Sequence, residues 1–443
     1  MNVDFQRKVD RILGTFICRL LSLFSLGRKT PAAPASVDKV LVILLSEMGS
    51  LVLAYPMFKR IREKYPHAAV HVLLFKKNRE MLEILKVVPS QHILTMDNSS
   101  MARFARDGMS LLARLRRAHF DVVIDCELFS RVSSILSYLS GADIRVGFHP
   151  HAQEGLYRGN FINRPVLYNP YHHISQQFVT LVEAIDSTTV PKAKRLVADN
   201  HQETPSVTFG PDEIGETARR LHAHAPSAMG KELVLIYPSG GLLPIRAWPL
   251  EYYCYLARQL LREGYAVGVI GLEEDKALAR EIQAYCGNPC CIDLTGYTKS
   301  IKELMLLFHC AALLITNDGG PGQFSAMTPI PTIVFFGPET PTLYAGLDRK
   351  AVIFHSPLSC SPCFSAYNHR KSPCDGDNVC LKRIQPDQVL AKALEILRTS
   401  ERVPPIELPA PTETARPDRI LAIDKTDRRL RQDQPSPDPS HPS

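Results

Sequence analysis

The sequence lacks several of the features that identify common classes of protein directly. It contains no G-x-G-x-x-G segment, which does not favour a nicotinamide-dependent enzyme. Its formal charge of +7 is spread along the chain without a basic run, so we expect no nucleic-acid partner. It shows no internal repeat of solenoid length. What remains is an ordinary globular composition, 45% hydrophobic and 22% charged, in 443 residues, enough for two domains and tails.

A hydrophobic run long enough to span a membrane is also missing from the N-terminus. Large apolar residues recur there at helical spacing among basic residues, but Arg19 keeps the stretch short of the ~20 residues that a span needs. We interpret residues 1–36 as an amphipathic helix that associates with an anionic membrane surface. Alternatively, this helix docks on its own domain. A signal peptide cleaved near Ala32–Ser36 is the weakest interpretation, because Arg19, Asp4 and Asp10 are out of place in one.

The eleven cysteines do not resemble the framework of a small disulfide-rich protein. Cys18, Cys126 and Cys310 lie in apolar runs, where we expect buried thiols and hence a reducing compartment. Four others have the spacing C-x2-C-x10-C-x5-C: Cys360, Cys363, Cys374 and Cys380. Such a set can hold a structural zinc ion, with His369 as a substitute ligand, or an iron–sulfur cluster. Reduced thiols or two disulfides are the alternatives.

From Val40 onward, short apolar strands alternate with helical segments. This pattern indicates an α/β protein with parallel sheets covered on both faces. A polar, proline-marked stretch at about 190–210 interrupts the alternation, which then restarts. We therefore predict two doubly wound domains, at residues 37–200 and 201–400, with a ligand cleft at the carboxyl ends of their strands. Residues 401–443 are rich in proline and charge, which predicts a disordered tail.

Small-residue turns follow three strands of the second half, at residues 238–241, 271–274 and 317–320. When a helix follows such a turn, its first N–H groups and positive dipole end suit a diphosphate. Each turn can equally be a tight connection that needs glycine. Arg246, just before the single tryptophan, could pair with a phosphate or cap a helix. The first turn of the chain differs, since Glu47 within it would repel a phosphate.

Four segments resemble glycosyltransferase family 9, the ADP-heptose–lipopolysaccharide heptosyltransferases, and occur in that family's order. They are LVILLSEMGSLVLAYPMFKRIREKYPHAAVHVL, RAWPLEYYCYLARQL, IDLTGYTKSIKELMLLFHCAALLITND and TNDGGPGQFSAMTPIPTIVFFGPETP. The resemblance covers roughly Val40 to Leu390. It implies the GT-B arrangement of two Rossmann-like domains, in which the second binds the nucleotide sugar and the first binds the acceptor. It also implies inverting transfer without an obligatory metal.

The resemblance assigns roles to the turns on both sides of the expected cleft. The first turn would face the acceptor, so the carboxylate of Glu47 becomes the candidate general base. Gly49, Ser50 and Glu127 would lie beside it, and Asp125 and Glu127 are the reserve candidates for the base. The donor side comprises the residues of the later turns and of the basic segment: Ser239, Gly240, Arg246, Glu273, Asp318, Gly319, Gly320 and Gln323.

Two positions depart from the family pattern. The family usually has Gly-Asp in the first turn, with the aspartate as proposed base, whereas this chain has Gly49-Ser50. The family's Asp-Ser/Thr-Gly-Pro-x-His becomes Asp318 to Gln323, which ends in an uncharged hydrogen-bonding side chain. These differences bear on the identity of the sugar and on activity itself.

We therefore expect a heptosyltransferase-like enzyme that moves a sugar, heptose from ADP-heptose in the first instance, to a lipid-linked glycan such as the lipopolysaccharide core. It would act in the cytoplasm, peripherally on the inner face of the membrane, and would need no catalytic cofactor. The main alternative is a catalytically degenerate protein that binds a nucleotide sugar or glycan. A sugar epimerase of the same fold and a periplasmic binding protein cleaved after Ala35 are further alternatives.

Overall fold

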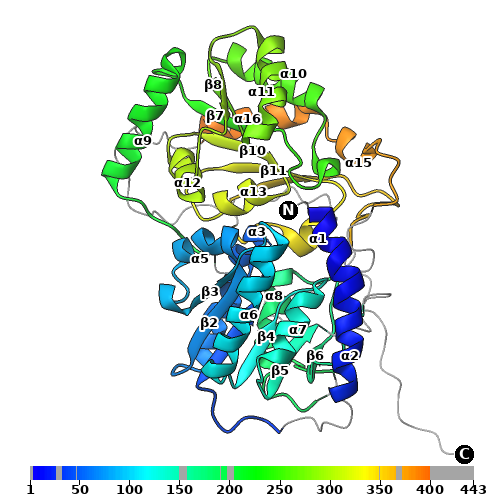
Figure 1. Cartoon of the computed structure of the whole chain (residues 1–443). Coiled ribbons are helices and arrows are strands. Elements are labelled where there is room, and N and C mark those ends of the chain that lie inside the picture. The colour runs from blue at the N-terminus through cyan, green and yellow to red at the C-terminus, as the bar shows by residue number, and fades with distance from the viewer. Residues whose placement is uncertain are drawn as a thin grey trace, which may run out of the picture.

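A computed structural model describes the chain over residues 3–25, 32–45, 47–148, 157–189, 191–196, 204–348, 350–365 and 372–399, with no side-chain description for residues 3 and 4. The predicted tail at 401–443 and His369 lie outside these residues. Figure 1 shows two α/β units, one above the other, with short helices between them.

The first unit is built on a six-stranded parallel sheet, which we call the N-terminal sheet. Its order is β3-β2-β1-β4-β5-β6. Its strands are β1 (Lys39–Ile43), β2 (Ala69–Phe75), β3 (Ile93–Met96), β4 (Val122–Asp125), β5 (Ile144–Phe148) and β6 (Arg164–Val166). The helices after β1 are α3 (Met48–Leu53), α4 (Tyr55–Lys64), α5 (Arg79–Leu85), α6 (Met101–Ala118), α7 (Arg131–Leu139) and α8 (Ile174–Glu183), with 3-10 turns η2 (Lys76–Asn78) and η3 (Ser90–His92).

The second unit repeats this topology on what we call the C-terminal sheet. Its order is β12-β11-β10-β7-β8-β9. Its strands are β7 (Leu233–Tyr237), β8 (Ala266–Gly271), β9 (Cys291–Thr295), β10 (Leu313–Asn317), β11 (Thr332–Phe336) and β12 (Val352–His355). Its longer helices are α9 (Pro211–His224), α10 (Leu250–Arg262), α11 (Lys276–Cys286), α12 (Ile301–His309) and α16 (Pro386–Thr399). The shorter ones are α13 (Gly320–Ser325), α14 (Pro341–Tyr344), α15 (Val379–Lys382), η5 (Pro226–Ala228), η6 (Pro244–Arg246) and η7 (Glu273–Asp275).

Both sheets have the Rossmann strand order. In each, the first strand lies inside the sheet, and later strands are added first on one side of it and then on the other. The central strands are covered on both faces, and all four residues from Val40 to Ile43 are fully buried. This explains why they appear in the sequence as continuous apolar runs rather than as alternating ones. The predicted α/β fold of GT-B type is confirmed.

Serine residues fix the starts of several helices that follow the strands. The hydroxyls of Ser100, Ser130 and Ser300 accept hydrogen bonds from the N–H groups three residues later, at 3.1–3.3 Å. Each satisfies an N–H group that has no partner within the helix, which is why serine is favoured there. Such local signals define where α6, α7 and α12 begin.

The N-terminal segment forms α1 (Val3–Val9), a π-turn η1 (Asp10–Gly14) and α2 (Thr15–Ser25). It lies along the side of the N-terminal unit, next to α7 (Figure 1). The predicted helix is therefore present, and it docks on its own domain as the alternative interpretation stated. Across the described residues, we find no helix with the length and apolar character required to cross a bilayer.

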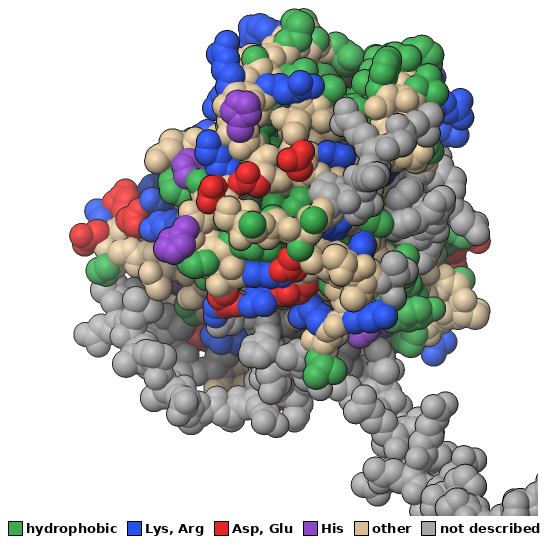
Figure 2. All heavy atoms as spheres, turned by 90° about the horizontal axis from the view of Figure 1, so that it is seen from below, with side chains coloured by type: hydrophobic (Ala, Val, Ile, Leu, Met, Phe, Trp, Pro, Cys, Tyr) green, Lys and Arg blue, Asp and Glu red, His purple; other side chains and the backbone are tan. Residues whose placement is uncertain are grey.

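The far end of the N-terminal unit carries charges of both signs. Figure 2 looks at the molecule from below and shows acidic and basic side chains interspersed over this face.

The described cysteines, which include all eleven, form no disulfide. Cys18 and Cys126 are buried as expected, whereas Cys310 is only half-buried.

Candidate active site between the two sheets

The turns that follow β1 and β10 meet between the two units. The short helices that they open, α3 and α13, lie side by side (Figure 1). Gly49 on α3 faces Gln323 on α13 so closely that a Cβ atom at residue 49 would lie 3.1 Å from the Gln323 Cγ. The structure thus brings together two segments that the sequence separates by more than 250 residues. Both were predicted to face the cleft.

The predicted acceptor side of this cleft contains two carboxylates. Glu47 precedes α3 and accepts a hydrogen bond at 3.2 Å from the Ser50 hydroxyl. Glu127 is 8% exposed, and its Oε1 accepts a hydrogen bond at 2.7 Å from the Leu45 N–H. Glu47, Ser50 and Glu127 line a small cavity of about 60 Å³, which we call the cleft pocket, and Tyr344 of the second unit closes it. Three of the four predicted acceptor-side residues therefore share one pocket.

Asp125, one of the reserve candidates for the base, is held inside the protein. It is fully buried at the end of β4, and its carboxylate accepts hydrogen bonds from Ser133 Oγ, the Glu127 N–H and Arg158. Burial raises the pKa of Asp125, although the Arg158 guanidinium opposes this rise. Arg158 also donates to the carbonyl oxygens of Glu127 and Ser130. Asp125 therefore fixes the loop that carries Glu127 and does not face the cleft.

An arginine between two carboxylates lies at the centre of the predicted donor side. Arg246, on η6, donates to Glu339, and its Nε lies 3.7 Å from Asp318 Oδ2. Asp318 and Glu339 follow β10 and β11 and are 8% and 3% exposed. Trp248 anchors this segment, because its Nε1 donates to the Ile384 carbonyl at 3.0 Å within the core. A buried anchor two residues away leaves Arg246 little freedom of position.

Backbone contacts fix the remaining donor-side turns. A Cβ atom on Gly240 would lie 2.6 Å from the Leu243 carbonyl oxygen, so only glycine fits there. Asn317 is fully buried, and its side-chain amide donates to the carbonyls of Tyr237 and Ser239. Gly319 and Gly320 lead into α13, while Gln323 donates to the Tyr344 carbonyl at 2.7 Å.

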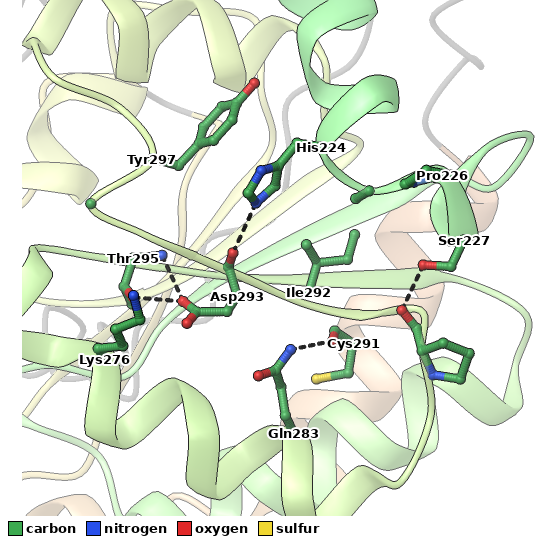
Figure 3. Close-up of a pocket in the computed structure, with 13 residues that line it drawn as sticks. His224, Pro226, Ser227, Lys276, Gln283, Cys291, Ile292, Asp293, Thr295 and Tyr297 are labelled. Carbon is green, nitrogen blue, oxygen red and sulfur yellow. Dashed lines mark hydrogen bonds between the residues drawn. The ribbon is translucent and has the colours of Figure 1, made fainter.

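Glu273 follows β8 and lies toward the β9 edge of the C-terminal sheet. It pairs with Lys276 at 3.5 Å and packs against Gly296, which follows the edge strand β9. Gly296 and Lys276 border a larger cavity of about 520 Å³, which we call the edge pocket. Figure 3 shows its polar side chains, with His224 directed at the Asp293 carbonyl and Thr295 bonded to the Asp293 carboxylate.

The four clustered cysteines do not form a metal site in the described structure. Cys363 Sγ accepts a hydrogen bond from Ser372 at 3.1 Å, and Cys374 Sγ accepts one from the Gly376 N–H at 3.4 Å. Cys360 is exposed, whereas Cys380 is 8% exposed. Among the residues that the structure describes, no three His, Cys, Asp or Glu side chains are arranged to hold a metal ion. The arrangement does not fit the predicted zinc or iron–sulfur cluster, and we derive no step from one.

Two residues of this site, Glu339 and Tyr344, were not singled out in the sequence, and Asn317 was predicted only as part of the turn at 317–320. Glu339 lies in the segment GPETP, and an acid directly after a buried strand is a signal that could have identified it. Asn317 and Tyr344 carry no comparable signal, because their roles depend on partners about 20 to 80 residues away. His173, whose Nε2 lies 2.9 Å from the Ala345 carbonyl oxygen, joins the two units in the same way.

Two Rossmann-like units that meet at the turns after β1 and β10, with a carboxylate pocket between them, have the architecture of the GT-B glycosyltransferases. The chain belongs to glycosyltransferase family 9 (heptosyltransferase), whose sequence profile matches residues 109–372. The sequence resemblance to this family is thereby confirmed.

Individual relatives agree with this assignment. Lipooligosaccharide heptosyltransferase 2 of Haemophilus ducreyi is 24% identical over 321 residues, which is 71% of this chain and 88% of that protein. Lipopolysaccharide heptosyltransferase 2 of Escherichia coli is 23% identical over 324 residues, covering 71% and 86%. The solved structure of E. coli ADP-heptose lps heptosyltransferase II has a TM-score of 0.63 at 20% identity, over 81% of this chain and 98% of that one. A family 9 structure from Veillonella parvula has a TM-score of 0.64 at 18% identity, over 84% and 100%.

Proposed function

We propose that this glycosyltransferase transfers a heptose from ADP-heptose to a lipid-linked glycan such as the lipopolysaccharide core, with inversion at the anomeric carbon. The observation that carries the proposal is the cleft pocket, in which Glu47, Ser50 and Glu127 of the first unit meet Tyr344 of the second, while the neighbouring Gly49 faces Gln323. Named relatives are lipopolysaccharide and lipooligosaccharide heptosyltransferases, which supports the donor and the class of acceptor.

In this proposal Glu47 is the general base. The acceptor hydroxyl oxygen attacks the anomeric carbon of the donor and passes its proton to the Glu47 carboxylate. The bond between that carbon and the phosphate oxygen breaks, and the nucleoside diphosphate leaves with the electron pair. Glu47 is exposed at the start of α3, so an acceptor can reach it, while the Ser50 hydroxyl orients its carboxylate.

The donor side would stabilise the departing diphosphate. Arg246 would supply positive charge on the donor side, and a guanidinium suits phosphate because it donates in a planar fork. Ser239, Gly240, Asp318, Gly319, Gly320 and Gln323 would shape the site around the nucleotide sugar, with Glu273 at its far edge. We propose the division into an acceptor domain at 37–200 and a donor domain at 201–400. Residues 1–36 would associate with the inner face of the membrane.

A catalytically degenerate binding protein is the second candidate. The observation in its favour is that the position after Gly49 carries the Ser50 hydroxyl, which cannot serve as a base at neutral pH. Gln323 likewise is neutral where the family has a charged or titrating group. In this case the chain would bind a nucleotide sugar without turning it over.

Calorimetry with a panel of nucleotide sugars, followed by a transfer assay with a lipid-linked acceptor, separates these candidates. We expect ADP-heptose to bind and Asp318→Ala to weaken its binding. Glu47→Gln should keep donor binding and lower kcat by roughly 10²–10⁴-fold, whereas Glu63→Gln, which also removes an exposed carboxylate of the first unit, should change neither. Donor binding without turnover in the wild-type chain would support the degenerate protein. No binding of any nucleotide sugar would refute both.

A further inference from the structure

The N-terminal segment docks on its domain through small and polar side chains. The Asp10 carboxylate accepts hydrogen bonds at 3.0 Å from the Arg131 and Val132 N–H groups, which begin α7, and also pairs with the Arg131 guanidinium at 3.3 Å. One turn later, a Cβ atom on Gly14 would lie 2.9 Å from the Arg131 Cβ. The contact is therefore specific, and it places η1 against the first turn of α7.

The same face of the segment continues into α2. Cys18 is fully buried, and Ser22 is 7% exposed. The Ser22 hydroxyl lies 2.8 Å from the Tyr157 hydroxyl and accepts a hydrogen bond from the Asn160 N–H at 3.2 Å. Residues 10, 14, 18 and 22 thus form an inward stripe without a large apolar side chain.

The outward face is apolar. Seven large hydrophobic side chains on it are between 47% and 67% exposed: Phe5, Ile12, Leu13, Phe16, Leu20, Leu23 and Phe24. A surface helix of a globular protein normally turns such residues toward the core. A contiguous exposed apolar face of this size marks a surface that a membrane or another molecule covers.

The charges that accompany this apolar face are all of one sign. Arg7, Lys8, Arg11 and Arg19 are exposed along the segment. Asp10 is the one acidic side chain of α1, η1 and α2 whose placement is described, and it points inward at α7. A second copy of the chain paired through this face would bring cations against cations, whereas anionic lipid headgroups would neutralise them.

We propose that this outward face, defined by the seven apolar residues above, inserts into the interfacial region of an anionic phospholipid bilayer. The segment is held flat against the N-terminal unit, so insertion would bring the whole unit to the membrane surface. Gln6 bonds to Asn98 just beyond the carboxyl end of β3, which places the start of the segment at the cleft edge of the sheet. The cleft opening is thus held beside the lipid. This proposal specifies the surface through which the membrane association named in the proposed function would occur. It rests on the proposed function for the lipid-linked acceptor.

Flotation of the full chain with vesicles tests this surface. We expect binding to vesicles of phosphatidylcholine with about one-third phosphatidylglycerol, weaker binding to phosphatidylcholine alone, and loss of the difference at high salt. The double variant Phe16→Ser, Leu23→Ser should bind at least tenfold more weakly, because both side chains are more than 60% exposed and would enter the bilayer. Arg11→Gln with Arg19→Gln should weaken binding about tenfold to the anionic vesicles only.

Met229→Ser is the matched control, since Met229 is 63% exposed but lies on the second unit, and it should bind like the wild type. Thermal unfolding of each variant checks that the fold is unchanged. Equal binding by all variants would overturn the proposal. It would also be overturned if the wild type did not bind vesicles and instead sedimented as a dimer that the double variant Phe16→Ser, Leu23→Ser abolished. Vesicle binding without sugar transfer would refute the proposed function alone, and transfer to a detergent-soluble acceptor without vesicle binding would refute the surface alone.

Discussion

Arg246 is held by two carboxylates, and the more buried of them, Glu339, sets its position. The arginine side chain is 15% exposed and that of Glu339 is 3% exposed, so the pair is largely shielded from solvent. A hydrogen bond to a charged partner in such surroundings contributes about 1.5–3 kcal/mol. Its function here would be to aim the guanidinium at the donor phosphates before the donor arrives.

Replacing Glu339 with glutamine should raise the donor KM and lower kcat, so that kcat/KM falls by about tenfold. The amide accepts a weaker hydrogen bond than the carboxylate, so Arg246 would be less well positioned for a phosphate contact that strengthens as the diphosphate departs. Steady-state kinetics with varied donor measures the effect. Glu263→Gln, which removes an exposed carboxylate paired with Arg398, is the control. A fall in KM would instead show that Glu339 competes with phosphate for Arg246.

His309 makes folding sensitive to acid. Burial lowers the pKa of His309 from its ordinary value of 6.5, because desolvation disfavours the charged ring. Below 6.5 the unfolded chain takes up a proton that the folded protein does not, so the free energy of unfolding decreases as the pH falls through the unfolded value.

Urea titrations at pH 7.5 and 5.5 should therefore show a smaller loss of stability for His309→Gln than for the wild type. His222→Gln, on the exposed side of α9, is the control and should retain the wild-type loss. An identical pH dependence in all three proteins would contradict the assignment.

At the scale of elements, Asn317 joins β7, β10 and the start of α10. Its Oδ1 accepts from the Trp248 N–H at 2.9 Å and from the Tyr253 hydroxyl at 3.2 Å, while its amide donates to the carbonyl of Tyr237, which ends β7, and to that of Ser239. Asn317→Ala leaves these buried groups without a partner and should cost about 2–4 kcal/mol of stability. Chemical denaturation followed by fluorescence of the single tryptophan, Trp248, measures this loss. Gln388→Ala, on the surface helix α16, should leave the midpoint unchanged.

The sequence predicted the elements well because their signals are local. Continuous apolar runs such as Val40–Leu45 identified the buried strands, and serines such as Ser300 precede helices that they cap. Partnerships across long separations could not be predicted. Nothing in the sequence near Asp125 indicates that Arg158 will form an ion pair with it, and nothing near Gly49 indicates that Gln323 will lie against it. Apart from the burial of Cys18, the inward stripe of η1 and α2 was missed because small residues carry no hydrophobic signal.

At the scale of the whole molecule, the two units are joined in a closed arrangement. The Glu80 carboxylate, on α5, accepts hydrogen bonds from the Ile301 and Lys302 N–H groups that begin α12 of the other unit, at 3.2 and 3.0 Å. His173 makes a second link to Ala345. A cleft pocket of about 60 Å³ is far smaller than typical ligand pockets of about 300–1,000 Å³. We infer that the units separate before substrates enter.

Glu80→Ala should shift this equilibrium toward the open arrangement. Two hydrogen bonds to a carboxylate at a helix N-terminus are lost, which should reduce the closed population by about tenfold. Small-angle X-ray scattering should then show a larger radius of gyration than for the wild type. Glu83→Ala, which removes a neighbouring exposed carboxylate paired with Arg79, should scatter like the wild type. An unchanged radius would mean that other contacts hold the units together.

The π-turn at Asp10–Gly14 sets the rotational phase of α2 relative to α1. Each residue of an α-helix advances about 100° around the axis, and a π-turn contains one residue more than an α-turn. If the same residues closed as an α-turn instead, the extra residue would rotate everything after it by about 100°. Asp10 and Ser22 could then no longer meet the domain together, and part of the apolar face would point toward the protein. The geometry of this one turn thus allows the segment to dock on its own domain and to present its apolar face outward at the same time.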